Sequence, residues 1–551
     1  MRRSARLPRP SSSISLSSSG LGFLCRLLSC RAIWASIETH MENLFTYVVP
    51  AILQMGSWAV VFAIISGVTF GVILGALPGF GSSQSLALLF PLTFAMPADV
   101  AIIFFLAVYS AAEYGGSIPA ILIRTPGTPA QSVTVLDGYT MAQQGYPNRA
   151  LKVSLFSGVI GGVTSTVIFI FVGGWIASVA LEFGPGEMFA LGIFGLSVIG
   201  SFFGRDPARG FLATGLGLFL ATVGASDFGG MRFTFDQAFL TDGIPLVVVI
   251  IAFLAGPESL RLLINHRKTV EKPKKVLAIE KTSDDRFPLR YVRRLVPTWI
   301  RSSLIGTAIG AIPGAGASIG SLIAYSEERR WSKRPAEEFG TGIPEGIAAP
   351  ETANNAVVAG TLVPSLTLGI PGSGSAAILL SVLISKGIVP GPLLFGQEPL
   401  LITTIFVGLI FINFWLLLLG LIYTRGFAYI SNIARRILGP LVFILILLGT
   451  YAYANYSAHV MMVIFLSMLA YWMVKVDIPV VPVVLAFVMG PIIETNLSRA
   501  MTIHAGDLSV VMTRPITLVI LFLALATFLY SAISSIREHR SKLQSRNEQK
   551  E

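Results

Sequence analysis

The residues best suited to chemistry lie between positions 342 and 395. This stretch places the carboxylate of Glu351 and the amides of Asn354 and Asn355 among apolar residues. Pro350 precedes Glu351, and proline is favoured in the first turn of a helix because its missing N–H would be unpaired there. The spacing i, i+3, i+4 then puts the three polar side chains on one helix face. Such a face could coordinate a cation or a proton, or it could join two helices as a satisfied polar network.

Pro-Gly pairs interrupt the apolar runs of the chain, and we refer to those at positions 78–79, 126–127, 313–314 and 371–372 as the four breaks. Within lipid, the backbone groups freed at such breaks must be taken up by protein or by a water-filled cavity. Freed amides at the N-termini of half-helices suit a carboxylate, and freed carbonyls at C-termini suit Na⁺. The breaks therefore predict a substrate- or ion-binding site made from Pro78, Gly79, Gly81, Ser83, Pro126, Gly127, Thr128, Pro313, Gly314, Gly316, Ser318, Pro371, Gly372 and Ser373.

Two ionisable residues near the breaks complete the predicted substrate- or ion-binding set, together with Glu351, Asn354 and Asn355. Glu113 precedes a Gly-Gly-Ser-Ile-Pro segment and has the same two interpretations as Glu351. Arg124 could meet an anionic substrate, because a guanidinium pairs bidentately with a carboxylate. It could equally extend to the membrane interface. Ionisable groups inside membranes are rare and usually functional.

The composition predicts an all-α polytopic membrane protein. The 551 residues are 53% hydrophobic and 13% charged, whereas soluble chains carry about 25% charged residues. Many apolar runs reach or approach the roughly 20 residues that cross a bilayer, so we expect roughly 10–12 transmembrane helices. Examples are residues 153–176, 244–263, 400–422, 438–452, 460–474 and 516–533.

The basic residues indicate orientation rather than nucleic-acid binding. The net charge is +11, but Lys and Arg lie mainly in short loops and tails between apolar runs, which is the positive-inside pattern. We therefore divide the chain into an N-terminal extension (1–40, disordered or preceding the true start), a first transmembrane half (41–264), a basic cytoplasmic linker (265–300), a second half (301–535) and a basic cytoplasmic tail (536–551).

Enzymatic and metal chemistry find little support in the sequence. Cys25 and Cys30 are the only cysteines, so the body of the chain can build neither a disulfide framework nor a cysteine metal site. His459 and His504 are isolated, and no nucleophile–base pair is evident. We expect no enzyme activity, no resident metal and no cofactor apart from a coupling ion, Na⁺ or H⁺, bound transiently at the predicted site.

The two halves repeat each other. Residues 71–83 match residues 306–318 at a constant offset of 235 positions, and residues 115–128 match 360–373 at an offset of 245. The Gly-x-x-x-Gly spacing in the first block favours close helix packing. Corresponding broken segments in two halves indicate a secondary-transporter site at the repeat interface. We predict two related halves with re-entrant Pro-Gly hairpins and favour inverted repeats.

Several motifs make the chain resemble the large membrane subunit (TctA type) of the tripartite tricarboxylate transporter family, from about Met41 to the last span. They are Tyr114-Gly115-Gly116-Ser117-Ile118-Pro119-Ala120-Ile121-Leu122, Pro126-Gly127-Thr128-Pro129-Ala130, Asp137-Gly138-Tyr139, Glu345-Gly346-x-Ala348-Ala349-Pro350-Glu351-x-Ala353-Asn354-Asn355, Leu368-Gly369-Ile370-Pro371-Gly372-Ser373 and Pro390-Gly391-Pro392-Leu393-Leu394-Phe395. Two features depart from the pattern: Arg124 stands where the family is expected to have Asn more often, and the extension before Met41 is not part of it.

The resemblance implies a bacterial inner-membrane permease that works with a small membrane subunit (TctB type) and a periplasmic solute-binding protein (TctC type). Such systems take up citrate and other carboxylates with an ion gradient, and the chain has no Walker A pattern. A stand-alone carrier or channel for organic anions is the alternative, and an intramembrane enzyme is a remote one.

Overall fold

The computed structural model describes residues 30–77, 80–202, 207–264, 289–423, 435–507, 509 and 513–548. In this part of the chain the only strands are β1 (Gly224–Ala225) and β2 (Met231–Arg232), which pair antiparallel. Eight of the described helical segments are long and apolar enough to cross a bilayer, and four shorter apolar helices accompany them. The prediction of an all-α polytopic membrane protein is confirmed.

The helices of the first half are, in chain order, α2 (Cys30–Met55), α3 (Trp58–Gly75), α4 (Ser82–Leu89), η1 (Phe90–Ala95), α5 (Ala98–Gly115), α6 (Ser117–Ile123), η2 (Pro129–Ser132), α7 (Thr134–Gln143), α8 (Pro147–Leu181), α9 (Pro185–Phe202), α10 (Pro207–Ala221), η3 (Ala238–Leu240), α11 (Leu246–Ile250), the π-helical η4 (Ile251–Ala255) and α12 (Gly256–Ile264). Those of the second half are α13 (Leu289–Gly310), α14 (Gly316–Trp331), η6 (Ala336–Glu338), α15 (Pro344–Leu368), α16 (Gly374–Ser385), α17 (Leu394–Gln397), α18 (Pro399–Tyr423), α20 (Arg435–Ala454), α21 (Ser457–Lys475), α22 (Val481–Ile503) and α24 (Pro515–Glu548).

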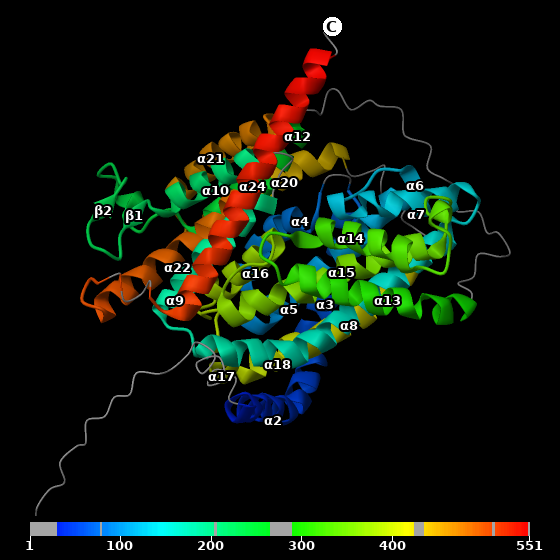
Figure 1. Cartoon of the computed structure of the whole chain (residues 1–551), viewed down its shortest axis with the longest axis horizontal. Helices are drawn as coiled ribbons and strands as arrows, with labels where there is room; N and C mark the ends of the chain where they lie inside the picture. Colours follow the sequence, from blue (N-terminus) through cyan, green and yellow to red (C-terminus); the bar gives the residue numbers. More distant parts are fainter. Residues whose placement is uncertain are drawn as a thin grey trace, which may run out of the picture.

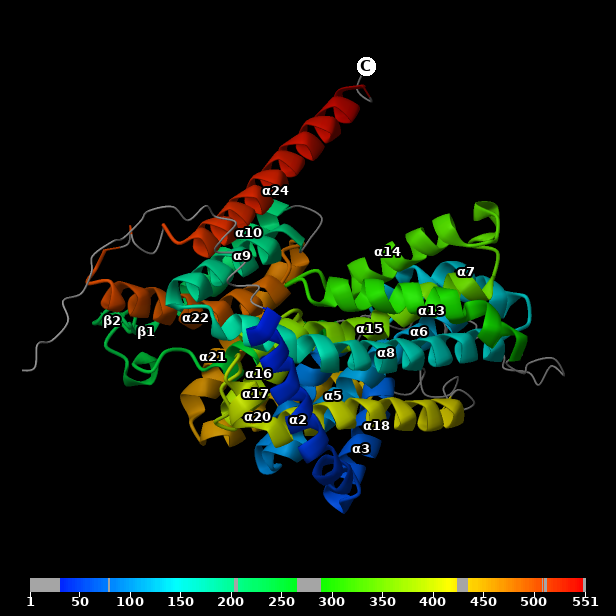
Figure 2. The ribbon, with the colours of Figure 1, turned by 60° about the horizontal axis from the view of Figure 1, so that its bottom comes forward.

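The broken helices lie in the middle of the molecule. Helices α4, α5 and α16 lie in the middle of the view in Figure 1. Helices α6, α7, α13 and α14 lie at one end of the molecule, and α9, α10 and α22 lie at the other. Helix α24 packs on α9, and its far end projects away from the other helices (Figure 2). The two short helices α4 and α16, which follow predicted breaks, are therefore surrounded by other helices.

Three segments predicted to lie outside the transmembrane halves are partly helical. Helix α2 begins at Cys30, so residues 30–40 continue into the body, where the ring nitrogen Nε2 of His40 lies 2.9 Å from the Ile170 carbonyl oxygen. Helix α13 begins within the predicted linker, and α24 continues through most of the predicted tail. Residues 1–29 and 265–288 lie outside the described residues.

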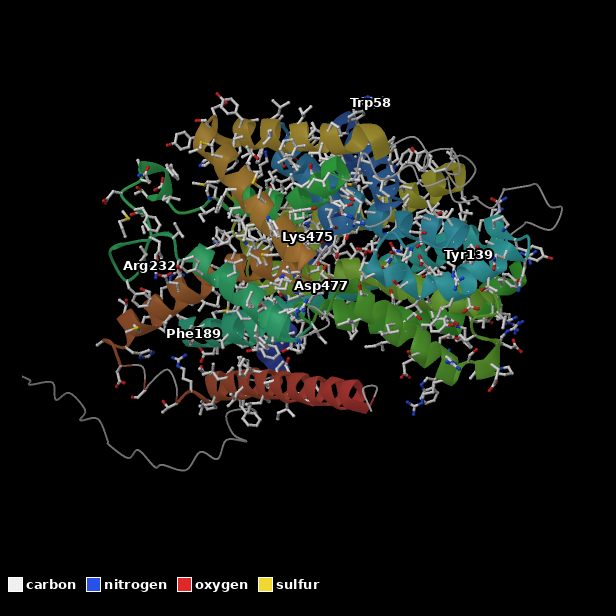
Figure 3. All side chains as sticks on the ribbon, turned by 90° about the horizontal axis from the view of Figure 1, so that it is seen from above. Trp58, Tyr139, Phe189, Arg232, Lys475 and Asp477 are labelled. Carbon is white, nitrogen blue, oxygen red and sulfur yellow. The ribbon has the colours of Figure 1, made fainter. Side chains whose placement is uncertain are left out.

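Large apolar side chains cover the outer faces of several helices. Trp58 (Figure 3) and Phe62 of α3, Phe465 of α21 and Phe522 of α24 are all exposed, Trp58 by 88%. Contiguous apolar faces of this kind are unusual on soluble monomers. They fit helices whose outer surface lies in hydrocarbon.

Glycines let two equivalent helix pairs approach closely. A Cβ on Gly71 of α3 would lie 2.6 Å from the Val108 carbonyl oxygen of α5. A Cβ on Gly306 of α13 would lie 2.4 Å from the Ala353 carbonyl oxygen of α15. The two contacts correspond by the sequence offsets, since Gly71 matches Gly306 and Val108 matches Ala353. The packing interpretation of these glycines is confirmed.

The second break of each half packs on the end of the first helix of that half. A Cβ on Gly127 would lie 2.5 Å from the Gly75 carbonyl oxygen, and one on Gly372 would lie 2.8 Å from that of Gly310. Both glycines are thus needed for close approach of one backbone to another. The repeat in the sequence is therefore a repeat of contacts between helices.

This packing predicts that Gly75→Ala destabilises the protein. The added methyl would lie 2.3 Å from the Ala112 carbonyl oxygen, and overpacking of this kind costs about 1–3 kcal/mol of the free energy of unfolding. The matched control is Gly215→Ala on α10, where nothing lies within 4 Å and alanine gains about 1 kcal/mol of helix propensity. Melting temperatures in detergent measure both, and equal values for the two variants would contradict the packing.

Candidate functional site

Two short helices meet at their N-terminal ends. Helix α4 follows the first break of the first half, and α16 follows the second break of the second half. The hydroxyl oxygen of Ser375 lies 2.9 Å from that of Ser82 and 2.9 Å from that of Ser83. A Cβ on Gly374 would lie only 3.0 Å from Ser83 Oγ. The two halves of the chain are joined at this serine cluster, which consists of Ser82, Ser83 and Ser375.

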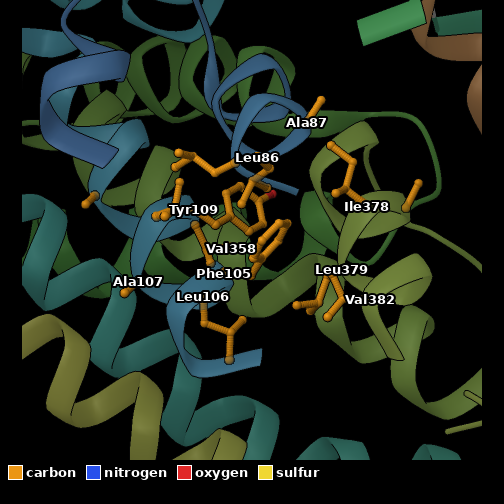
Figure 4. Packing of buried hydrophobic residues seen from close by; sticks show 14 of the residues in the cluster. Leu86, Ala87, Phe105, Leu106, Ala107, Tyr109, Val358, Ile378, Leu379 and Val382 are labelled. Atoms are coloured by element: carbon orange, nitrogen blue, oxygen red, sulfur yellow. The ribbon is translucent and has the colours of Figure 1, made fainter. Parts of the chain in front are cut away.

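Helices α4 and α16 run side by side from the serine cluster. Beyond their other ends, Lys386 Nζ donates to the Met96 carbonyl oxygen at 2.6 Å. Figure 4 shows Leu86 of α4, Tyr109 of α5 and Ile378 of α16 in one packed cluster of buried side chains. Because the two helices start together, the positive ends of their dipoles point toward the same place.

Glu113 of α5 lies against these N-termini. Its side chain is 4% exposed, and Ser82 Oγ donates to its Oε1 at 2.6 Å, while its Oε2 has no hydrogen-bond partner. None of the ion pairs among the described residues includes Glu113. The nearest electrostatic support for this carboxylate is therefore the serine hydroxyl and the two helix N-termini.

Tyr109 extends the polar cluster to the second break of the second half. Its hydroxyl lies 3.2 Å from Ser373 Oγ and 3.4 Å from Thr361 Oγ1. Ser373 also caps α16, since its Oγ accepts the Ala376 amide at 3.1 Å. Pro371 is buried just before this cap. The predicted Ser373 thus has a defined structural role at the start of α16.

The segment around the second break of the first half is hydrogen-bonded to the backbone of Glu113. Thr128 donates its amide to Gln131 Oε1 at 3.0 Å, and Gln131 Nε2 donates to the Glu113 carbonyl oxygen at 2.7 Å. Asn354 of α15 donates to the same carbonyl oxygen at 3.2 Å. A Cβ on Gly81, before α4, would lie 3.3 Å from Thr128 Cγ2. Segments from both halves therefore fix the last turn of α5.

Glu351 is a buried acceptor of three hydroxyl groups. Ser117 Oγ and Ser154 Oγ donate to its Oε2 at 2.5 and 2.9 Å, and Thr134 Oγ1 donates to its Oε1 at 2.5 Å. The three donors come from α6, α8 and α7, so the carboxylate ties α15 of the second half to three helices of the first. This geometry favours a satisfied polar network for Glu351.

The start of the helix that carries Glu351 differs from the prediction. Helix α15 begins at Pro344, so Pro350 lies inside it, and the prediction that Pro350 marks the first turn is wrong. Pro344 takes that position, where a proline costs no hydrogen bond. Glu351, Asn354 and Asn355 still share one face of α15, but their side chains contact different helices. A Cβ on Gly158 of α8 would lie 2.6 Å from Asn355 Nδ2, whereas Asn354 faces α5.

The first break of the second half lies beside the other break of its own half. Gly314 donates its amide to the Gly372 carbonyl oxygen at 3.0 Å, after the partly buried Pro313. Gly314 and Gly316 have φ of 81° and 65°, which favour glycine. Ser318 is exposed on α14, and its hydroxyl forms no described bond to the serine cluster. Helix α14 contacts η2 of the first half, as α16 contacts α4.

Arg124 lies outside the buried cluster. It ends α6 with φ of 53°, is exposed, and places its guanidinium carbon 5.9 Å from the centre of the Tyr139 ring. Pro126 is partly buried nearby in sequence. Pro78 and Gly79 lie outside the described residues. Of the predicted residues, Ser83, Glu113, Thr128 and Ser373 thus lie at or near the serine cluster, whereas Arg124 and Ser318 are exposed.

Sequence reasoning missed Ser82, Ser375 and Tyr109. The first two are neighbours of the predicted Ser83 and Ser373, and their place in the first turn after a break was an available signal. The hydroxyl groups around Glu351 come from three separate helices, so no spacing in the sequence could have indicated them.

Asp137 fixes the loop that leads into α15. Its carboxylate is fully buried and accepts the amides of Gly340, Gly342 and Ile343 at 2.9–3.0 Å. The Tyr325 hydroxyl donates to its Oδ2 at 3.0 Å. Four donors from the second half therefore converge on one carboxylate of the first half.

The arrangement contains groups that can bind an anion. Serine hydroxyls and two helix N-termini converge in one buried place, and helix N-termini bind anions. Within the described ranges, no three His, Cys, Asp or Glu side chains gather as metal ligands.

Comparisons with known proteins give one matching family model and two similar proteins. The family model "Tripartite tricarboxylate transporter TctA family" matches residues 61–485. An "uncharacterized 52.8 kDa protein in TAR-I ttuC' 3'region" of Agrobacterium vitis is 34% identical over 478 residues, which cover 87% of this chain and 94% of that protein. An "uncharacterized protein in TAR-II ttuC' 3'region" of the same organism is 36% identical over 238 residues, 43% of this chain and 98% of that protein. No solved structure matches the chain significantly.

The Asp137 contacts predict a graded loss of stability. Asp137→Asn replaces an oxygen that accepts backbone amides by an NH₂ group, so the free energy of unfolding should fall by at least about 2 kcal/mol. Tyr325→Phe removes a single donor and should cost about 1 kcal/mol. Thermal unfolding in detergent measures both, and a smaller effect for Asp137→Asn than for Tyr325→Phe would contradict this assignment.

Proposed function

The chain belongs to the tripartite tricarboxylate transporter TctA family, and from this membership we propose that it is the large transmembrane permease subunit of a binding-protein-dependent secondary uptake system. It is a multi-pass membrane protein of a transporter family. The proposed substrates are tricarboxylates or related carboxylates, and the proposed location is the bacterial inner membrane. The matched residues, 61–485, contain all four Pro-Gly breaks.

The observation that carries this proposal is the meeting of α4 and α16 at the serine cluster. Helix geometry leaves first-turn amides without a backbone partner within the helix, although the Ala376 amide is capped by Ser373 Oγ, and the hydroxyls of Ser82, Ser83 and Ser375 lie beside these turns. A substrate carboxylate placed here accepts hydrogen bonds from hydroxyls and amides and is stabilised by two helix dipoles. Citrate-like substrates carry several carboxylates, so further polar groups around the serine cluster would hold the others.

Each half contributes one of the two helices, which supports a cycle of alternating access. Helix α4 belongs to the first half and α16 to the second, so a movement of these two helices relative to each other opens or closes the contact between them. Helix α14 and η2 form the repeat-related counterpart of this contact. A cation gradient, of Na⁺ or H⁺, drives this cycle in our proposal, since the sequence has no Walker A pattern.

The proposed partners are a small membrane subunit of TctB type and a periplasmic binding protein of TctC type. Reconstitution of the three proteins in liposomes tests this assignment with radiolabelled citrate and related carboxylates. Uptake that needs all three components supports the proposal. Equal uptake by the large subunit alone would instead identify a stand-alone carrier.

The serine cluster predicts weaker substrate binding in Ser375→Ala. Loss of one hydroxyl donor to a carboxylate costs about 1–1.5 kcal/mol, or about five- to tenfold in the substrate concentration for half-maximal uptake. The matched control is Ser385→Ala on the same helix, whose hydroxyl donates only to the Val382 carbonyl oxygen of that helix. The assignment fails if both variants transport with wild-type affinity.

A further inference from the structure

The helical body contains two buried carboxyl groups with opposite surroundings. Both oxygens of Glu351 accept hydroxyl groups, three in all. Glu113 has one such donor, Ser82, and its Oε2 is buried without any partner. Burial of an unpaired charge is costly, and a buried carboxyl group usually avoids the cost by carrying a proton. The environment of Glu351 therefore suits a permanent structural role, and that of Glu113 suits a change of state.

No described basic side chain offsets a charge on Glu113. The titratable groups that face it are Tyr109 on its own helix and Glu351 on α15. The neighbours from α4, α15 and η2 are the hydroxyl of Ser82 and the side-chain amides of Asn354 and Gln131. Both amides donate to the Glu113 backbone carbonyl oxygen, and the Asn354 amide also lies close to the carboxyl group. Lys386 lies at the far ends of α4 and α16.

Ionised Glu113 and a substrate carboxylate would compete for the same positive helix ends, the N-termini of α4 and α16. Ser82 bridges them: its hydroxyl donates to Glu113 at 2.6 Å and lies 2.9 Å from Ser375 Oγ on the opposite helix. Two carboxylates this close repel each other strongly in a buried site. A protonated Glu113 removes this repulsion, leaves both helix N-termini to the substrate, and supplies one additional O–H donor.

We propose that Glu113 carries the coupling proton of the transport cycle. This proposal rests on the transport function proposed above. One proton enters from the outer solution and binds Glu113 Oε2 as a substrate carboxylate binds at the serine cluster. After the change of access, the substrate and the proton leave to the cytoplasm, and Glu113 returns as a carboxylate to the Ser82 hydroxyl. Each cycle thus moves one proton together with one substrate molecule.

A substrate-free measurement tests the protonation itself. Infrared difference spectra are recorded on the full chain in lipid as the buffer changes from alkaline to acidic. We expect a band of a buried protonated carboxyl group that Glu113→Gln removes and Glu351→Gln retains. Ser82→Ala, which removes the hydrogen bond to Oε1, should change the frequency of this band. A band that persists in Glu113→Gln and disappears in Glu351→Gln overturns the proposal, as does the absence of any such band.

A transport measurement tests the coupling. Liposomes containing the complete three-component system and a lumenal pH dye receive radiolabelled citrate under a pH gradient. Wild-type uptake should acidify the lumen, and Glu113→Gln should still exchange labelled for unlabelled citrate but lose both acidification and accumulation. The control Glu187→Gln alters a buried carboxylate that pairs with Arg514 at 3.2 Å and should remain proton-coupled.

The outcomes separate the two proposals. Wild-type protein that shows no carboxylate exchange contradicts the proposed function, and the infrared result still decides on Glu113. Wild-type exchange without lumenal acidification, or acidification that Glu113→Gln leaves unchanged, overturns the proton role alone. Protein quality is checked by monodispersity and melting temperature, and Ser82→Ala provides the test should Glu113→Gln fail to fold.

Discussion

The structure depends on one constraint: a backbone group freed inside a membrane must find its partner within the protein. Four Pro-Gly breaks free such groups in the middle of this chain. Each break whose packing is described lies against another backbone, as Gly127 does on Gly75 and Gly372 on Gly310. The long helices α3, α5, α13 and α15 approach closely through glycine, and this close packing encloses the breaks. Only under such enclosure can short helices such as α4 and α16 begin deep inside the molecule.

The two halves repeat their glycine-mediated helix contacts but not their buried carboxyl groups. The position that corresponds to Glu113 in the second half is Val358, and the position that corresponds to Glu351 in the first half is Leu106. The glycine contacts follow the repeat, because they build the frame in both halves. The carboxyl groups do not follow it: Glu113 lies beside the contact of α4 with α16. The repeat-related contact of α14 with η2 has no equivalent of Glu113, because the corresponding residue is Val358.

Burial alone does not assign a role to a carboxyl group in this protein. Asp137 and Glu351 are both fully buried, and each accepts several donors from the other half of the chain. They hold the halves and their loops in register. Glu113 is buried to a similar degree, but one of its two carboxyl oxygens, Oε2, has no hydrogen-bond partner. In our proposal, the number of partners, rather than the depth of burial, distinguishes the structural carboxylates from Glu113.

The sequence by itself determined the class of the protein, its family, its repeat and the positions of its breaks. Hydropathy, proline and glycine act on the local structure, so their effects can be recognised from the sequence. The sequence also placed Glu113, Ser373 and Asn354 among the candidate site residues. The tertiary structure alone decided which breaks meet, because α4 and α16 come from opposite halves and are adjacent only after folding. It likewise showed Glu351 with its three hydroxyl donors and Arg124 at the surface. Contacts between distant segments follow from packing, and no periodicity in the chain encodes them.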